Sequence, residues 1–240
     1  MVRERRLVAC LAIHGGLTRR HAAEILWPQA DIGRRLTSLR TALHALRRRV
    51  PDLVVSDESS LRLSESAASD LQELRTAIAG VTARRGHQPI PSDGHRILAT
   101  TGDLLPGWYD DWVLLERERL RHQRVAALQL LARAALDRRQ PRRAVRFATA
   151  ASEIEPYDDT TEHLLISAQV AIGHLADAVC TYRHYCRRLA EELGVAPAPL
   201  VTQLVQEAMI TQRRNHARMS ADRWSDTRRV GPVQPSRRSA

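Results

Sequence analysis

The clearest apolar pattern in the first quarter of the chain runs from Ile32 to Val50. Leucines and a valine recur there at spacings of three and four, which places them on one side of a helix. These residues are Leu36, Leu39, Leu43, Leu46 and Val50. Asp31 precedes the helix as its expected N-cap. The pattern predicts an amphipathic helix with its leucine side buried.

The opposite side of this helix carries no carboxylate and mixes arginine with small hydroxyl residues. At about 100° per residue, it holds Arg34, Thr37, Ser38, Thr41, His44, Ala45 and Arg48, flanked by Arg35, Arg40 and Arg47. Arginine can contact guanine edges or phosphates, and serine and threonine can contact several bases. The predicted DNA contacts are Arg34, Ser38, Arg40, Thr41, His44, Arg47 and Arg48. The alternative interpretation is a solvated basic helix face.

Two shorter helices, Leu7–His14 and Arg19–Trp27, precede this one, separated by glycines and closed by a proline. Thr18 has the place of an N-cap for the second. After Pro51, alternating segments around a polar turn at 57–60 predict a β-hairpin. Because a two-stranded ribbon is marginal alone, it must pack on the helices or on another strand. Residues 1–75 are therefore predicted to form a winged helix-turn-helix domain.

The remainder of the chain is predicted to be helical after a turn-rich segment. Residues 76–103 are expected to be a linker with one short helix ending near Ala83. The helices expected beyond it span residues 110–138, 141–154, 159–172, 175–193 and 198–212. Ala144 and Ala178 lie 34 residues apart, each near the start of a helix, which is typical of tetratricopeptide-like helix pairs. Residues 104–210 thus form a second, helical-repeat domain, and residues 211–240 a disordered basic tail.

Charge is distributed unevenly along this mainly α chain. All 37 basic residues are arginine, which is typical of codon bias in a GC-rich genome. Residues 1–50 carry a net charge of +8, residues 51–208 of −4 and residues 209–240 of +6. Codon bias does not explain a near-neutral middle between two cationic ends. Attraction to a polyanion does, because arginine neutralises phosphates and releases counterions.

The sequence contains no signature of an enzyme. Phosphate-binding loops, dinucleotide fingerprints, nucleophile elbows and zinc-protease motifs are all absent. The ten histidines and three cysteines do not have metal-ligand spacing, and the cysteines are expected to be reduced. No signal peptide and no run of 18 apolar residues is present. We therefore expect a cytoplasmic protein that is not an enzyme, has no cofactor or metal, and does not enter a membrane.

Several segments resemble a known family. The segment LLPGWYDDWVLLERERLRHQRVAALQLLARAAL, from Leu104 to Leu136, resembles the opening of the bacterial transcriptional activation domain found in the SARP-like (antibiotic regulatory protein) regulators of actinobacteria. The resemblance continues through PRRAVRFATAASEIEPYDD to the turn ELGVAPAP. The earlier segments LTRRHAAEILWP and LTSLRTALHALRR resemble the DNA-binding domain of the same family.

This resemblance implies a winged-helix domain fused to tetratricopeptide-like helices. It also implies binding to direct repeats near promoters, often as a dimer, and recruitment of RNA polymerase, so that the protein acts as an activator. Thr41, Arg47 and Arg48 match family-like positions of the recognition helix. Three aromatic residues match a hinge that packs the activation domain: Trp108, Tyr109 and Trp112.

The chain also departs from the family pattern in three places. The family has an antiparallel sheet ahead of the first helix, whereas here a helix is expected almost from Met1. Ala42 and Ala45 stand where relatives often have histidine and arginine, which removes two possible DNA contacts. The turn residues Asp57 and Glu58 are acidic, which disfavours docking on phosphates. The alternative function is therefore a helical-repeat interaction module whose winged domain binds DNA weakly.

Overall fold

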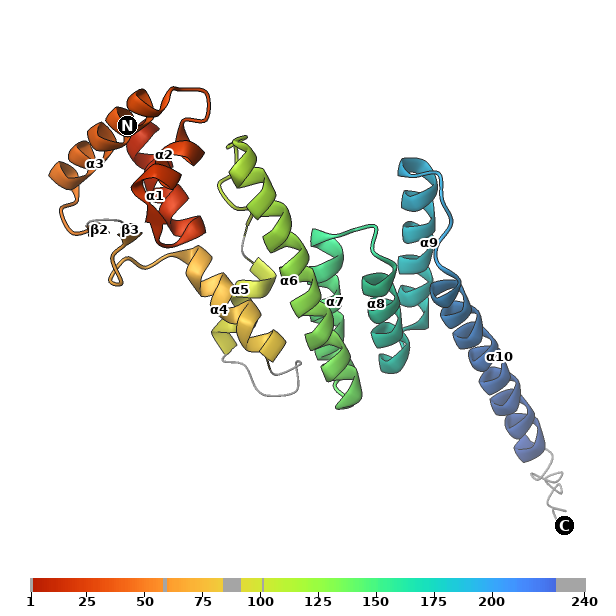
Figure 1. Cartoon of the computed structure of the whole chain (residues 1–240). Coiled ribbons are helices and arrows are strands. Elements are labelled where there is room, and N and C mark those ends of the chain that lie inside the picture. Colours follow the sequence, from red (N-terminus) through yellow and green to blue (C-terminus); the bar gives the residue numbers. More distant parts are fainter. Residues whose placement is uncertain (1, 58–59, 84–91, 101, 228–240) are drawn as a thin grey trace, which may run out of the picture. The chain divides into compact units, whose positions relative to one another are not determined.

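The computed structural model describes residues 2–57, 60–83, 92–100 and 102–227, and these are mainly helical (Figure 1). The chain divides into two compact units, Met1–Leu131 and Ala132–Ala240. The division falls inside one long helix, α6 (Asp111–Asp137), so each unit contains part of that helix. The sequence analysis had placed its domain boundary earlier, after residue 103.

The first unit opens with helices and short strands in alternation. The helices are α1 (Val2–His14), α2 (Arg19–Leu26) and α3 (Ile32–Arg49), and the strands are β1 (Leu17–Thr18), β2 (Val54–Ser56) and β3 (Ser60–Leu63). The sheet is antiparallel in the order β1-β3-β2, with Leu17 opposite Leu61 and Val55 opposite Arg62. The predicted hairpin thus gains a third strand, β1, which the sequence analysis did not identify.

One hydrophobic core lies beneath α1, α2, α3 and the sheet. Leu7, Cys10, Leu26 and Leu61 are each at most 1% exposed within it. Burial raises the pKa of the Cys10 thiol to about 12, so this cysteine is a protonated, unreactive core residue at neutral pH. The core gives α3 a fixed surface on which to lie.

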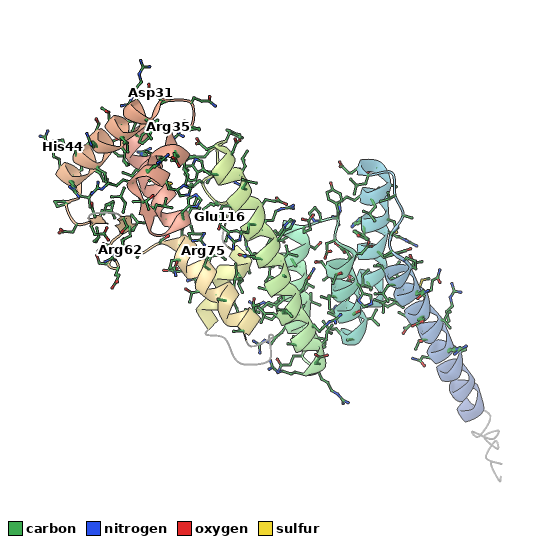
Figure 2. The ribbon with its side chains drawn as sticks, viewed as in Figure 1. Asp31, Arg35, His44, Arg62, Arg75 and Glu116 are labelled. Carbon is green, nitrogen blue, oxygen red and sulfur yellow. The ribbon has the colours of Figure 1, made fainter. Side chains whose placement is uncertain are left out.

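Three further helical segments follow in the same unit: α4 (Asp70–Ala83), α5 (Ser92–Thr100) and the first part of α6. Arg75 of α4 donates to Glu116 Oε1 of α6 at 2.5 Å and to the Ile13 carbonyl of α1 at 2.8 Å, and Figure 2 shows Arg75 and Glu116 facing each other. Arg6 of α1 donates to Asp110 Oδ1 at 2.5 Å. These ion pairs connect α1 to α4 and to the start of α6.

The second unit continues with antiparallel neighbours. Its helices after α6 are α7 (Pro141–Ile154), α8 (Asp159–Ile172), α9 (Leu175–Glu192) and α10 (Pro199–Thr227). Successive helices pack side by side, and α10 packs on both α8 and α9 (Figure 1). Asp158 caps α8 by accepting from the Thr161 N–H at 2.8 Å. Gly173 ends α8 at φ +90°, a left-handed conformation that favours glycine.

A buried polar cluster connects three of these helices. Glu162, 2% exposed, accepts from Ser152 Oγ at 2.6 Å and from Arg188 Nη2 at 3.1 Å. The Arg188 guanidinium also lies 5.9 Å and 5.7 Å from the ring centroids of Tyr157 and Tyr185. Desolvation raises the pKa of Glu162, although Arg188 and Ser152 act to lower it.

The helices expected at 141–154, 159–172 and 175–193 are present almost residue for residue, but the last one, expected at 198–212, is longer. The tail, expected to be disordered from Thr211, continues as α10 to Thr227. The reason is local: no glycine or proline occurs between Pro199 and Gly231, so nothing in that segment stops the helix. Residues 228–240 lie outside the described residues.

The expected linker also differs from the structure. α4 ends at Ala83 as expected, but a second helix, α5, follows and packs against α4. The apolar residue that attaches it is Leu98, which is 0% exposed and whose carbonyl accepts from Arg124 of α6 at 2.5 Å. Residues 84–91 and 101 lie outside the described residues. In the described part of the chain, no helix is long and apolar enough to cross a membrane.

Candidate nucleic-acid interface

Side-chain caps and a tight turn position α3 behind α2. Thr18 begins α2 by accepting from the His21 N–H at 3.2 Å, and Asp31 begins α3 by accepting from the Arg34 N–H at 2.9 Å. Both were predicted from the sequence. Arg35, which was expected only to flank the exposed face, reaches back across the turn and donates to the Pro28 carbonyl at 2.5 Å. The second and third helices are thereby fixed at their junction.

The buried side of α3 is close to the predicted leucine stripe. Leu39, Leu43 and Leu46 are buried, but Val50 is 47% exposed because the helix ends at Arg49 and the chain turns away. Ala42 is 1% exposed and belongs to the core. The comparison of Ala42 with a DNA-contacting histidine was therefore wrong, since this position faces inward.

The seven predicted DNA-contacting residues lie on the other side of α3. Six are exposed, and one, Ser38, is half-buried: the exposed six are Arg34, Arg40, Thr41, His44, Arg47 and Arg48. At about 100° per residue, Arg48 lies opposite the buried leucines. Figure 2 shows His44 on this side of α3. The structure therefore brings the predicted residues together on one surface, which we call the α3 face.

The arginines of the α3 face differ in their partners. Arg34 Nε lies 3.2 Å from Asp31 Oδ2, an exposed pair of small energetic value. Arg40, Arg47 and Arg48 have no ion pair with any carboxylate among the described residues. Three guanidinium groups are thus available to an external anion.

Thr41 of the α3 face and its neighbour Thr37 have already used their hydroxyl protons. Thr37 Oγ1 donates to the Gly33 carbonyl at 2.9 Å, and Thr41 Oγ1 donates to the Thr37 carbonyl at 3.0 Å. What remains for a ligand is a methyl group and a hydroxyl lone pair. Thr41 can therefore contact an apolar group or accept a hydrogen bond, but it cannot donate one without breaking its bond to the helix.

The hairpin beside α3 carries a charge that the sequence analysis missed. Arg62 is exposed on β3, where Figure 2 labels it, and its nearest carboxylate oxygen, on Glu65, is 3.7 Å away. Its alternation with buried Leu61 could have identified it as an outward position. Arg19 of α2 donates to Ser56 Oγ at 2.5 Å and so attaches the hairpin to the helices.

The acidic turn of the hairpin is explained in part by local bonding. Asp57 accepts from both the backbone N–H and the hydroxyl of Ser60, at 2.5 Å and 2.6 Å. Its carboxylate therefore builds the turn, as aspartate commonly does. Glu58 and Ser59 lie outside the described residues.

The predicted aromatic hinge is only partly correct. Trp112 packs against the core beneath α3 and its ring lies 6.1 Å from that of His14. Trp108 is half-buried, and its carbonyl accepts from Arg117 at 3.1 Å. Tyr109, by contrast, is 79% exposed and does not pack, because the chain turns at Gly107 and leaves this side chain outside.

Comparison with known proteins gives similarities along most of the chain. Residues 100–208 match the family model of the bacterial transcriptional activator domain. The chain is 26% identical over 215 residues to the regulatory protein AfsR of Streptomyces coelicolor. This alignment covers 86% of this chain and 22% of that protein. It thus spans less than a quarter of the length of this relative.

A solved structure has the same fold. Mycobacterium tuberculosis EmbR, determined in complex with a low-affinity phosphopeptide, aligns with a TM-score of 0.63 and 19% identity. The alignment covers 88% of this chain and 60% of that one. It therefore supports the arrangement of elements rather than a shared ligand.

Proposed function

We propose that this chain is a SARP-like transcriptional regulator that carries a bacterial transcriptional activator domain, and that it binds promoter DNA through the α3 face. The observation that carries the proposal is the set of three exposed arginines, Arg40, Arg47 and Arg48, without carboxylate partners on a helix fixed over a packed core. A surface of this kind suits the major groove, which admits a single helix.

We infer that α2, the turn and α3 act as a helix-turn-helix, with β2 and β3 as its wing. In such modules the second helix enters the major groove while neighbouring elements contact the backbone. Arg40 and Arg48 then contact guanine edges or phosphates, and Arg62 contacts a phosphate from the wing. Arg34, Ser38, His44 and the others of the α3 face complete the contact surface.

The helical unit is proposed to contact proteins. Its side-by-side helix pairs are consistent with a tetratricopeptide-like repeat, an architecture that presents a surface to partners. We propose that it supports dimerisation on promoter repeats and contact with RNA polymerase, and that the protein acts as an activator in the cytoplasm. These roles are the ones that the resemblance to SARP-like regulators implies.

The test is a gel-shift titration of the full chain with the upstream region of its own gene, at two salt concentrations. The variant Arg40→Ala/Arg48→Ala should lose about 1–3 kcal/mol of binding free energy for each base contact removed and should lose preference for that region. The control is Arg183→Ala/Arg187→Ala, which removes two exposed arginines of α9 and should leave the preference for that region unchanged. Unchanged promoter preference in the double variant would exclude the α3 face.

A second function has its own structural support. Between α9 and α10, Leu193, Val195 and Leu200 are 54%, 51% and 60% exposed, which is unusual so close together in sequence. Such a surface suits a helical-repeat module that acts by binding another protein. Retention of DNA only at low salt, without preference for the upstream region, would favour this alternative.

A further inference from the structure

A second concentration of arginine lies in the Ala132–Ala240 unit, around the turn between α6 and α7. Residues 132–146 contain six arginines and one acid, a net charge of +5, whereas residues 147–208 contain three arginines and nine acids, a net charge of −6. Codon bias raises arginine in both segments alike, so it does not account for this segregation. Something specific to the turn must favour cations there.

Five of these arginines fall within nine residues, and all five are exposed. They are Arg138, Arg139, Arg142, Arg143 and Arg146, which we call the turn arginines. The buried side of α7 is formed by Ala144, Ala148 and Ala151, so Arg142 and Arg146 lie on the opposite side of that helix. The turn arginines are therefore a group of exposed cations that lie close together in sequence.

No carboxylate of a described residue forms an ion pair with any turn arginine. The one side-chain hydrogen bond that a turn arginine makes to a described residue has an uncharged partner: Arg143 Nη1 donates to Gln140 Oε1 at 3.1 Å. Elsewhere in this unit, Arg188 is held by buried Glu162, whereas the exposed Arg183 and Arg187 of α9 form no ion pair with a described residue. The turn arginines are thus uncompensated although acids are abundant elsewhere in the unit.

The helix dipole favours Arg138 and Arg139 at the C-terminal end of α6, but it gives no reason for the arginines of α7. Arg142 and Arg143 stand in the first turn of α7, where the helix dipole disfavours positive charge and where no acid is present. Arg139 has φ +56°, a left-handed conformation that glycine or asparagine adopts at lower cost. Arg139, Arg142 and Arg143 thus stand against the local preference of the backbone, as expected for residues that bind an external anion.

The surroundings indicate which kind of anion. Among the described residues, no large apolar side chain is exposed between residues 116 and 156. Protein interfaces are usually centred on apolar or aromatic anchors, whereas a polyphosphate requires only cations. The absence of such anchors favours a nucleic-acid backbone over an acidic protein.

We propose that the turn arginines bind the phosphate backbone of DNA without sequence preference, as a contact separate from that of the α3 face. This inference rests on the proposed function in one respect, namely that DNA is the partner. It adds to that function a second contact, located in the activator-domain unit, which supplies affinity and no base recognition.

The test compares two triple variants of the full chain that each remove three positive charges. The first, Arg142→Gln/Arg143→Gln/Arg146→Gln, neutralises part of the turn arginines with a good helix former. The matched control, Arg183→Gln/Arg187→Gln/Arg213→Gln, changes exposed positions of α9 and α10. Circular dichroism and the melting temperature should be unchanged in both, because all six side chains are exposed.

Binding is measured as a function of salt on two probes, the upstream duplex and a random-sequence duplex of equal length and GC content. The slope of log K against log salt is negative, and loss of three phosphate contacts makes it shallower by about 2.7. Between 50 and 200 mM salt, the first variant should therefore lose about 40-fold less affinity than the wild type on both probes. The control should keep the wild-type slope.

Equal slopes in the wild type and the first variant would overturn the proposal, as would equal changes in the two triple variants, which would reflect net charge alone. If the first variant keeps the DNA slope but no longer binds poly-glutamate, the partner is an acidic protein and the proposal is wrong. A failure of the proposed function can be told apart from a failure of this proposal. If the proposed function is wrong, the wild type shows no preference for the upstream duplex. The slopes on random-sequence DNA still test the turn arginines.

Discussion

The α3 face and the turn arginines are both cationic, but they differ in what lies between the charges. On α3, arginines alternate with Thr37, Thr41 and His44, which can contact base edges in different ways. Around the α6–α7 turn the arginines are neighboured mainly by one another and by Gln140. A mixed surface offers several kinds of base contact, whereas a surface of arginines alone offers contacts to guanine edges and phosphates only. Within one chain, the α3 face is thus suited to base recognition and the turn arginines to electrostatic attraction of the DNA backbone.

The two surfaces also differ in their support. The α3 face depends on long-range packing, because residues from α1, α2 and the sheet form the core beneath it. The turn arginines depend on a short connection whose geometry is local, with the Gln140 N–H donating to the Ala135 carbonyl at 2.8 Å. A change in the core should therefore affect the two surfaces unequally.

The largest expected effect is a loss of stability in the variant Leu39→Ala, which truncates a side chain of the core under α3. Leu39 is 2% exposed, so truncation should lower the free energy of unfolding of the first unit by about 2–5 kcal/mol. Trp27 and Trp112 pack against the same core, and their fluorescence in urea can follow its unfolding. Leu115→Ala, at a site 74% exposed, should change stability by less than about 0.5 kcal/mol. Similar losses in both variants would contradict the description of this core.

A smaller effect is expected from the N-cap of α3. Asp31→Ala should lower the free energy of unfolding by about 1 kcal/mol, whereas Asp31→Asn should leave it unchanged because asparagine caps equally well. Both variants also remove the carboxylate beside Arg34, so the salt slope of DNA binding should steepen by about 0.9 if Arg34 then gains a phosphate. An unchanged slope in Asp31→Asn would place Arg34 away from DNA.

The smallest effect concerns Thr41 and sharpens the contrast between recognition and attraction. Its hydroxyl proton is used by the helix, so we expect its methyl group to contact a thymine methyl. Thr41→Ser should weaken binding by about fourfold, the value of one methyl contact, while Thr41→Val should not. Replacing thymine with deoxyuridine in the bound site should abolish the difference between wild type and Thr41→Ser. A loss in Thr41→Val alone would indicate a hydroxyl contact instead.

The sequence predicted most clearly those features that arise within a few residues of one another. Thr18 and Asp31 were identified as caps because capping joins residues three apart. The bounds of α7 and α8 matched because Pro141, Asp158 and Gly173 mark their ends locally. The exposed side of α3 followed from helical periodicity alone.

Features that depend on contacts between distant residues were missed or mistaken. β1 is only two residues long and exists because Leu17 pairs with Leu61. α5 was hidden by turn-forming residues around it, yet it packs on α4 through Leu98. Ala42 was taken for a DNA-facing position because family likeness carries no information about which side of the helix is buried here.

By itself, the sequence determined the amphipathic helices, their caps, the uneven charge and the resemblance to a regulator family. Periodicity, capping and composition are properties of residues near one another in the chain, so they can be recognised without knowledge of the fold. Only the tertiary structure decided which arginines are left without carboxylate partners. Arg75 and Arg188 form ion pairs with Glu116 and Glu162, which are far away in sequence. Arg48 and Arg142 form no ion pair with a described carboxylate. Pairing of charges is set by distance in space, which the order of residues does not contain.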